Sequence, residues 1–80
     1  MVNKMITLTL CHKNDESLIN DAAVSVNTIC EETNCQMTWG DPTSETISWD
    51  FFTRNSRQEE CVRSMLMDLV YDYPYCVTVD

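Results

Sequence analysis

The residues with the clearest chemical potential in this chain are cysteines and its single histidine. Cys11 and His12 are adjacent, which suggests a nucleophile with a neighbouring general base. Cys30 and Cys35 could meet where a helix gives way to a strand, and with one histidine they form an incomplete zinc set. Neighbours on a strand point to opposite faces, so Cys11 and His12 cannot readily pair. We therefore predict no catalytic residues, no metal site and no cofactor.

The cysteine count argues in the same direction. The chain has five cysteines, an odd number, at irregular spacing, and it has only one glycine. A protein held together by disulfides more often has an even number of cysteines in a glycine-rich chain with many loops. We expect free thiols that act as small hydrophobic side chains in a reducing cytoplasm. The N-terminal 13 residues end in His12 and Lys13 without a small-residue cleavage site, so we do not interpret them as a signal peptide. No apolar run approaches the roughly 20 residues that span a bilayer.

The segment "GDPTSE", residues 40–45, holds the only glycine of the chain. A phosphate-binding loop would need several glycines leading into a helix, whereas this segment leads into an alternating apolar run. It separates two such runs, which predicts the turn of a β-hairpin. We expect Gly40 to adopt a conformation that other residues resist and Pro42 to preset the turn.

Hydrophobic periodicity places these residues on six elements. Alternating apolar positions predict strands, and apolar positions three and four residues apart predict helices. Ser56 and Glu59 have the spacing of a capping box at the start of the second helix, which Pro74 ends. The expected strands are 5–10, 35–39, 46–52 and 75–79, and the expected helices are 18–32 and 56–73.

The order β-α-β-β-α-β in one compact domain, residues 1–80, predicts an α+β, ferredoxin-like fold. Both helices would cover one face of a four-stranded antiparallel sheet; an α+β roll with another strand order is the alternative. Strand parity places Trp39 and Trp49 in the core and Phe52 on the open face, where an exposed aromatic side chain is typical of an interface. The expected open-face residues are Thr7, Thr9, Cys11, Gln36, Thr38, Ser48, Asp50, Phe52, Cys76 and Thr78.

Charge is the most distinctive global property. Thirteen acidic residues against five basic ones give a formal net charge of −8. Such a chain is repelled by phosphate backbones and by anionic membranes, which disfavours direct binding to nucleic acid or to a membrane. The expected open face also lacks lysine and arginine and has one aromatic residue, unlike an RNA-binding sheet. The charge instead favours a protein partner with a basic surface.

In length, acidity and lack of catalytic motifs the chain resembles the small acidic inhibitor proteins of phages, of the anti-CRISPR and anti-restriction type. That resemblance implies a non-enzymatic inhibitor in the host cytoplasm that blocks a basic nucleic-acid-binding surface, such as that of a CRISPR effector complex. Two alternatives are a small enzyme or metal-handling domain that uses Cys11 and His12, and an assembly module that pairs through its edge strands. The expected binding residues are Asp15, Glu16, Asp21, Glu31, Glu32, Asp41, Glu45, Asp50, Phe52, Glu60, Asp68 and Asp72.

Overall fold

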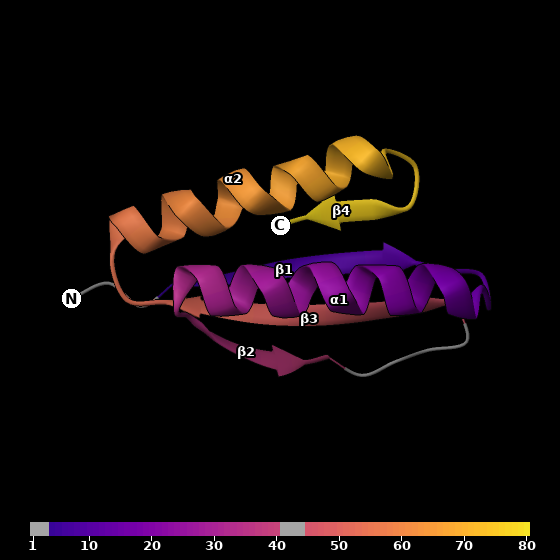
Figure 1. Ribbon diagram of the computed structural model, residues 1–80, viewed down its shortest axis with the longest axis horizontal. Helices are drawn as coiled ribbons and strands as arrows, with labels where there is room; N and C mark the ends of the chain where they lie inside the picture. Colours follow the sequence, from indigo (N-terminus) through magenta and orange to yellow (C-terminus); the bar gives the residue numbers. More distant parts are fainter. Residues whose placement is uncertain (1–3, 41–44) are drawn as a thin grey trace.

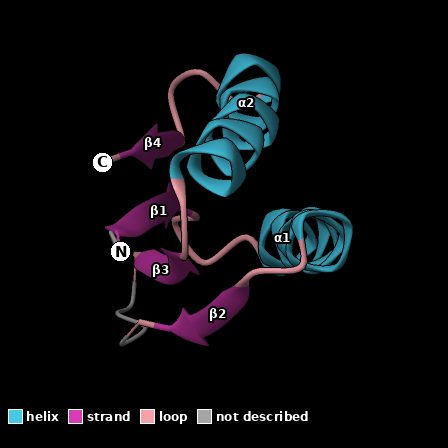
Figure 2. Cartoon of the chain, turned by 90° about the vertical axis from the view of Figure 1, so that its left-hand side faces the viewer, coloured by secondary structure: helices cyan, strands magenta, loops and turns pink. Residues whose placement is uncertain are grey.

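The computed structural model describes residues 4–40 and 45–80, which form one sheet and two helices. The strands pair antiparallel in the order β2-β3-β1-β4. Both helices lie on the same side of this sheet (Figures 1 and 2), so the predicted ferredoxin-like α+β fold is confirmed. The elements are β1 (Lys4–Cys11), α1 (Glu16–Thr33), β2 (Gln36–Trp39), β3 (Thr46–Thr53), α2 (Ser56–Asp72) and β4 (Val77–Val79).

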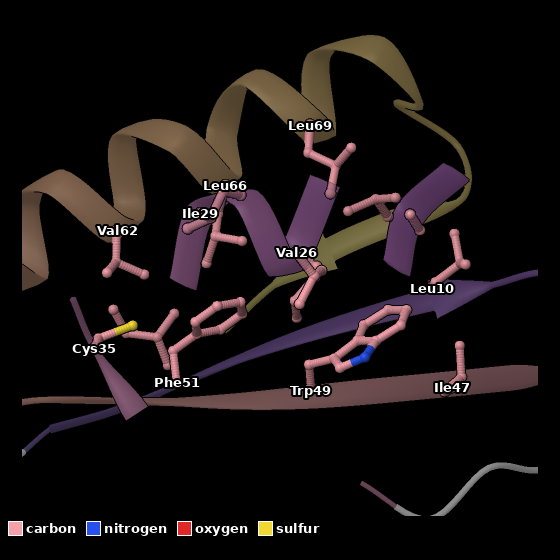
Figure 3. Packing of buried hydrophobic residues seen from close by; sticks show 14 residues of the cluster. Leu10, Val26, Ile29, Cys35, Ile47, Trp49, Phe51, Val62, Leu66 and Leu69 are labelled. Carbon is pink, nitrogen blue, oxygen red and sulfur yellow. The ribbon is translucent and has the colours of Figure 1, made fainter. Parts of the chain in front are cut away.

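The core lies between the two central strands and the helices (Figure 3). Alternate residues of β1 and β3 point toward the helices, and the strand register sets Leu8 opposite Trp49 and Ile6 opposite Phe51. Each helix contributes one apolar stripe, as its 3.6-residue period predicts. The buried side chains at the centre are Ile6, Leu8, Leu10, Ala22, Val26, Ile29, Trp49, Phe51, Val62, Leu66 and Leu69.

The ends of α1 follow from its flanking residues. The Asp15 side chain accepts a hydrogen bond from the Leu18 amide at 3.2 Å and forms the N-cap. Asn34 ends the helix in the left-handed conformation, with φ of 54°. Asparagine tolerates that conformation better than most residues, which explains why the helix stops there. No helix in residues 4–40 or 45–80 is long and apolar enough to cross a membrane.

The predicted capping box at Ser56 is wrong, because the N-cap of α2 is Asn55. The Asn55 side chain accepts a hydrogen bond from the Gln58 amide at 2.8 Å, and the Gln58 side chain accepts one from the Arg54 amide at 2.7 Å. Asparagine is among the strongest N-cap residues, so the cap forms one residue earlier. Glu59 is thereby free to pair with basic side chains.

Trp39 is not a core residue, contrary to its prediction. Its side chain is 57% exposed, whereas Trp49, directly opposite, is fully buried. β2 is a four-residue edge strand with a neighbour on one side only, so little of the protein covers Trp39. The two indole rings still make contact, with centroids 5.5 Å apart and planes tilted by 54°.

The last strand is shorter than predicted. The amides of Cys76 and Val77 both donate to the carbonyl oxygen of Tyr73 at 3.1 Å, so the chain turns before β4 begins. Tyr75, expected in the core, is consequently 96% exposed. Cys76, expected on the open face, is half-buried and packs against the core. Cys61 lies on the flank of α2 and is exposed, because helical geometry turns it about 100° away from the buried Val62.

The predicted hairpin pairing of β2 with β3 is confirmed, but the role expected of Gly40 is wrong. Gly40 does not have a positive φ. A Cβ atom at this position would instead overlap the Oγ of Ser48 on the neighbouring strand. A side chain at position 40 would require Ser48 to shift, since the Ser48 backbone oxygen and Cβ would also lie only 3.1 and 3.2 Å from the added atom. The predicted turn residues 41–44, Asp41 and Pro42 among them, lie outside the described residues.

Candidate binding surfaces

Acidic side chains gather at one end of the molecule because the two helices run in opposite directions. Figure 1 shows that α1 begins and α2 ends toward the same end of the molecule, so the acids of the first turns of α1 and of the last turns of α2 lie on that half of the protein. Glu45 joins them, since its carbonyl oxygen accepts hydrogen bonds from the amides of His12 and Lys13 at 2.7 and 3.3 Å. We term six exposed residues the acidic end: Asp15, Glu16, Asp21, Glu45, Asp68 and Asp72.

The opposite end of the molecule is nearly neutral. Four of the five basic residues lie at or beside the first half of α2. Lys4 and Arg63 both pair with Glu59, at 3.6 and 3.1 Å, and Arg54 and Arg57 flank the helix start. Four acids balance these charges: Glu31, Glu32, Glu59 and Glu60. The net charge of the protein is therefore concentrated on the acidic end, with smaller contributions from the sheet.

A groove of about 260 Å³ runs between the two helices and reaches the acidic end. We term it the interhelical groove. Its polar lining includes Glu32 of α1 and Asp68 and Asp72 of α2, and its apolar lining is Val24, Ile29, Met65 and Leu69. Val24 is 66% exposed, which adds an apolar contact beside the carboxylates. Such a surface matches a partner that presents apolar side chains flanked by basic ones.

Asp68 and Asp72 occupy positions that local helix physics disfavours. They are one helical turn apart and repel each other. Asp72 also lies at the negative end of the helix dipole, in a last turn that contains no basic residue. Positions where local preference is violated without an evident structural gain are typical of functional surfaces.

A second cavity, of about 440 Å³, lies where α1 ends and α2 begins. Several of its polar groups make hydrogen bonds within the fold. Arg54 Nη2 donates to the Asn34 carbonyl oxygen at 3.0 Å, and Gln58 Nε2 donates to the carbonyl oxygens of Thr33 and Asn34 at 3.1 and 3.0 Å. These bonds satisfy the carbonyl groups at the end of α1. We therefore assign this cavity a structural role and favour the interhelical groove as a binding surface.

The open face of the sheet carries Asp50 and Phe52, as predicted. Both side chains point away from the helices, because their strand neighbours Trp49 and Phe51 are buried in the core. Thr7 Oγ1 donates a hydrogen bond to Asp50 Oδ1 at 2.8 Å. Phe52 is 37% exposed and lies opposite Met5, a residue that the sequence interpretation missed although it shares the parity of Thr7.

The single histidine and two of the cysteines make hydrogen bonds within the fold. His12 is buried, and its Nδ1 accepts a hydrogen bond from the Asn14 amide at 2.9 Å, which stabilises the turn before α1. Cys30 and Cys35 do meet as expected, with Cys30 Sγ donating to the Cys35 carbonyl oxygen at 2.9 Å. Burial is the main cause of a raised pKa of the Cys30 thiol, with smaller contributions from Cys35 and Glu31. Within residues 4–40 and 45–80, no three His, Cys, Asp or Glu side chains could together hold a metal ion.

The other predicted binding residues are dispersed. Glu31 and Glu60 are exposed on the helices but do not line the interhelical groove, and Asp41 lies outside the described residues. The apolar members of the groove, Val24 and Met65, were not predicted as binding residues. Their sequence signal is weak, since an apolar residue on a helix is more often part of the core.

Comparisons with protein-family models, with curated proteins and with solved structures gave no significant match to this chain.

Proposed function

We propose that this protein is a non-enzymatic binding protein whose acidic end and interhelical groove dock on a basic surface of a protein partner. The observation that carries the proposal is the separation of charge along the molecule. Six exposed acids share one end with a single basic residue of the described chain, Lys13, whereas basic and acidic residues balance at the other end. The apolar lining of the groove adds the contact area that charge alone lacks.

The physics of association favours such an arrangement. A concentrated negative potential steers a basic partner toward one end of the molecule and orients it before contact. The steering acts over a Debye length of about 8 Å at physiological salt, so it is sensitive to ionic strength. Apolar contacts with Val24 and Met65 would then slow dissociation.

The resemblance to phage inhibitors supports a specific class of partner. A basic surface that holds nucleic acid, such as that of a CRISPR effector complex in the host cytoplasm, has the required charge. We propose inhibition by occupation of that surface, and no direct binding to nucleic acid. A nucleic acid carries a long, regular row of phosphate charges, whereas the acids of this protein form one patch. The acidic end would therefore cover only part of a nucleic-acid-binding surface.

The test begins with affinity capture of partners at rising salt, followed by binding kinetics with the purified partner. Asp68→Lys with Asp72→Lys should slow association at least tenfold, because both changes reverse charge in the groove. The matched control is Glu31→Lys with Glu60→Lys. It changes the net charge by the same amount outside the groove and should alter association less than threefold.

Three results would contradict the proposal. Equal effects of the two double variants would show that net charge matters and the acidic end does not. Affinity that is indifferent to both salt and charge reversal would exclude electrostatic docking. Binding of the purified protein to DNA or RNA at physiological salt would exclude the proposed mode of action.

A further inference from the structure

The carboxylate of Asp50 occupies a defined position at the centre of the open sheet face. β3 is an inner strand, and Asp50 lies opposite Thr7 on one side and Thr38 on the other. The hydrogen bond from Thr7 Oγ1 to Asp50 Oδ1, at 2.8 Å, fixes the carboxylate. The side chain is half-buried, so its charge is partly withdrawn from water.

An apolar surface adjoins this carboxylate. Phe52 is two residues further along β3 and therefore lies on the same face, about 7 Å away along the strand. The strand register sets Met5 and Gln36 on either side of Phe52. Phe52 is 37% exposed and Met5 is 56% exposed, so both remain accessible beside Asp50.

The described chain supplies no basic side chain to this carboxylate. The one side-chain hydrogen bond of Asp50 within residues 4–40 and 45–80 is the bond that its carboxylate accepts from Thr7. The basic side chains with defined ion pairs, Lys4 and Arg63, both contact Glu59 on the helix side of the sheet. A partly desolvated carboxylate gains most from a cation that is itself weakly hydrated.

We propose that Asp50 and Phe52 form a binding site for a guanidinium group, presented by an arginine side chain of a partner protein. The planar guanidinium would donate hydrogen bonds to the Asp50 carboxylate and lie over the Phe52 ring, a combination that an ammonium group cannot reproduce. Met5 would pack against the methylene groups of the arginine. The site lies on the opposite side of the sheet from both helices, so it is independent of the interhelical groove (Figure 2).

The probes are Nα-acetyl-arginine amide and Nα-acetyl-lysine amide, titrated into the ¹⁵N-labelled protein at low salt. Arginine amide should shift the backbone resonances of Thr7, Asp50 and Phe52 in a saturable manner, with at least fivefold higher affinity than lysine amide. Asp50→Asn should abolish these shifts. It should keep the fold, because the asparagine oxygen can still accept the Thr7 hydrogen bond.

Two further variants separate this site from general attraction to acids. Phe52→Leu should retain the carboxylate and lower the preference for arginine over lysine to less than twofold. Asp68→Lys with Asp72→Lys should leave the shifts at Asp50 unchanged, whether or not the proposed groove function holds. Equal binding of the two amides, shifts confined to the acidic end, unchanged shifts in Asp50→Asn, or no shifts at all would each overturn the proposal.

Discussion

Gln58 in the first turn of α2 donates a hydrogen bond through its Nε2 to the carbonyl oxygen of Asn34, at 3.0 Å, and so joins the start of one helix to the end of the other. The same nitrogen donates to the Thr33 carbonyl oxygen at 3.1 Å, and the side-chain oxygen accepts from the Arg54 amide. One side chain thus satisfies backbone groups of two elements that are more than 20 residues apart in the sequence. These bonds tie the end of α1 to the start of α2.

Replacing Gln58 with alanine should lower the free energy of unfolding by about 0.5–1.5 kcal/mol, because backbone groups at the helix ends lose their side-chain partner. Urea denaturation would measure the change. Ser64→Ala, an exposed substitution on the same helix, should change stability by less than about 0.5 kcal/mol. Similar losses in the two variants would show that the Gln58 bonds contribute little.

Gly40 and Ser48 should be energetically coupled. Gly40→Ala should destabilise the protein by about 1 kcal/mol or more, because the added Cβ overlaps Ser48 Oγ. Ser48→Gly removes that oxygen and should recover part of the loss in the double variant. A double-mutant cycle would detect a coupling energy of at least about 0.5 kcal/mol. Additive effects would mean that the close approach of the strands does not constrain residue 40.

Replacing each of the two tryptophans should change the stability of the protein by very different amounts, and their fluorescence should be quenched to different extents. Trp49→Ala removes a fully buried ring and should lower the free energy of unfolding by about 3–5 kcal/mol, whereas Trp39→Ala should cost about 1 kcal/mol. In single-tryptophan variants, acrylamide should quench Trp39 strongly and Trp49 weakly. Equal quenching would contradict the burial of Trp49.

Phenylalanine should be a mild substitution at position 49. Trp49 Nε1 is buried and has no hydrogen-bond partner among the described residues. Trp49→Phe deletes this unpaired donor, which offsets part of the loss of ring volume. We therefore expect Trp49→Phe to lose less than half of the stability that Trp49→Ala loses. Thermal unfolding of the two variants would measure both losses of stability. Equal losses in Trp49→Phe and Trp49→Ala would contradict the presence of an unpaired donor at Trp49.

The thiols should differ in reactivity and in their effect on stability at high pH. Cys61 is exposed and should be alkylated first, whereas Cys30, whose pKa is raised chiefly by burial, should react slowly.

The unfolded chain releases the Cys30 proton at a lower pH than the folded chain does. Stability should therefore decrease as pH rises above the ordinary thiol pKa of about 8.5.

Cys30→Ala should weaken that decrease in stability, and Cys61→Ala is the control that should retain it. Stability measured by urea denaturation between pH 7 and pH 10 would provide the comparison. An identical pH dependence in the wild-type protein and Cys30→Ala would show that another group is responsible.

Much of the fold follows from local sequence. The alternation of Ile6, Leu8 and Leu10 with threonines predicts a strand that is covered on one side, and the core confirms it. The helix ends predicted at Asn34 and Pro74 lie within a residue or two of the observed ends. Both signals act locally, because asparagine tolerates the left-handed conformation and proline cannot continue a helix. The order of these elements then leaves few ways to cover one face of a sheet, which is why the overall fold could be predicted.

Tertiary structure decided the rest. Strand parity places Trp39 and Trp49 on the same face, but only the position of β2 at the sheet edge determines that one is exposed and the other buried. The roles of Gly40 and Gln58 likewise depend on partners from other elements, which periodicity cannot reveal.

Charge shows the same division between sequence and structure. The sequence by itself determined the net charge of −8 and the acids that carry it. Asp21 and Asp72 are 51 positions apart, and neither has a local pattern that predicts a shared surface. The antiparallel arrangement of α1 and α2 brings them to one end, while Lys4 and Arg63 meet Glu59 toward the other. The acidic end therefore exists only in the folded protein, because packing of the two helices on one sheet face sets which charges become neighbours.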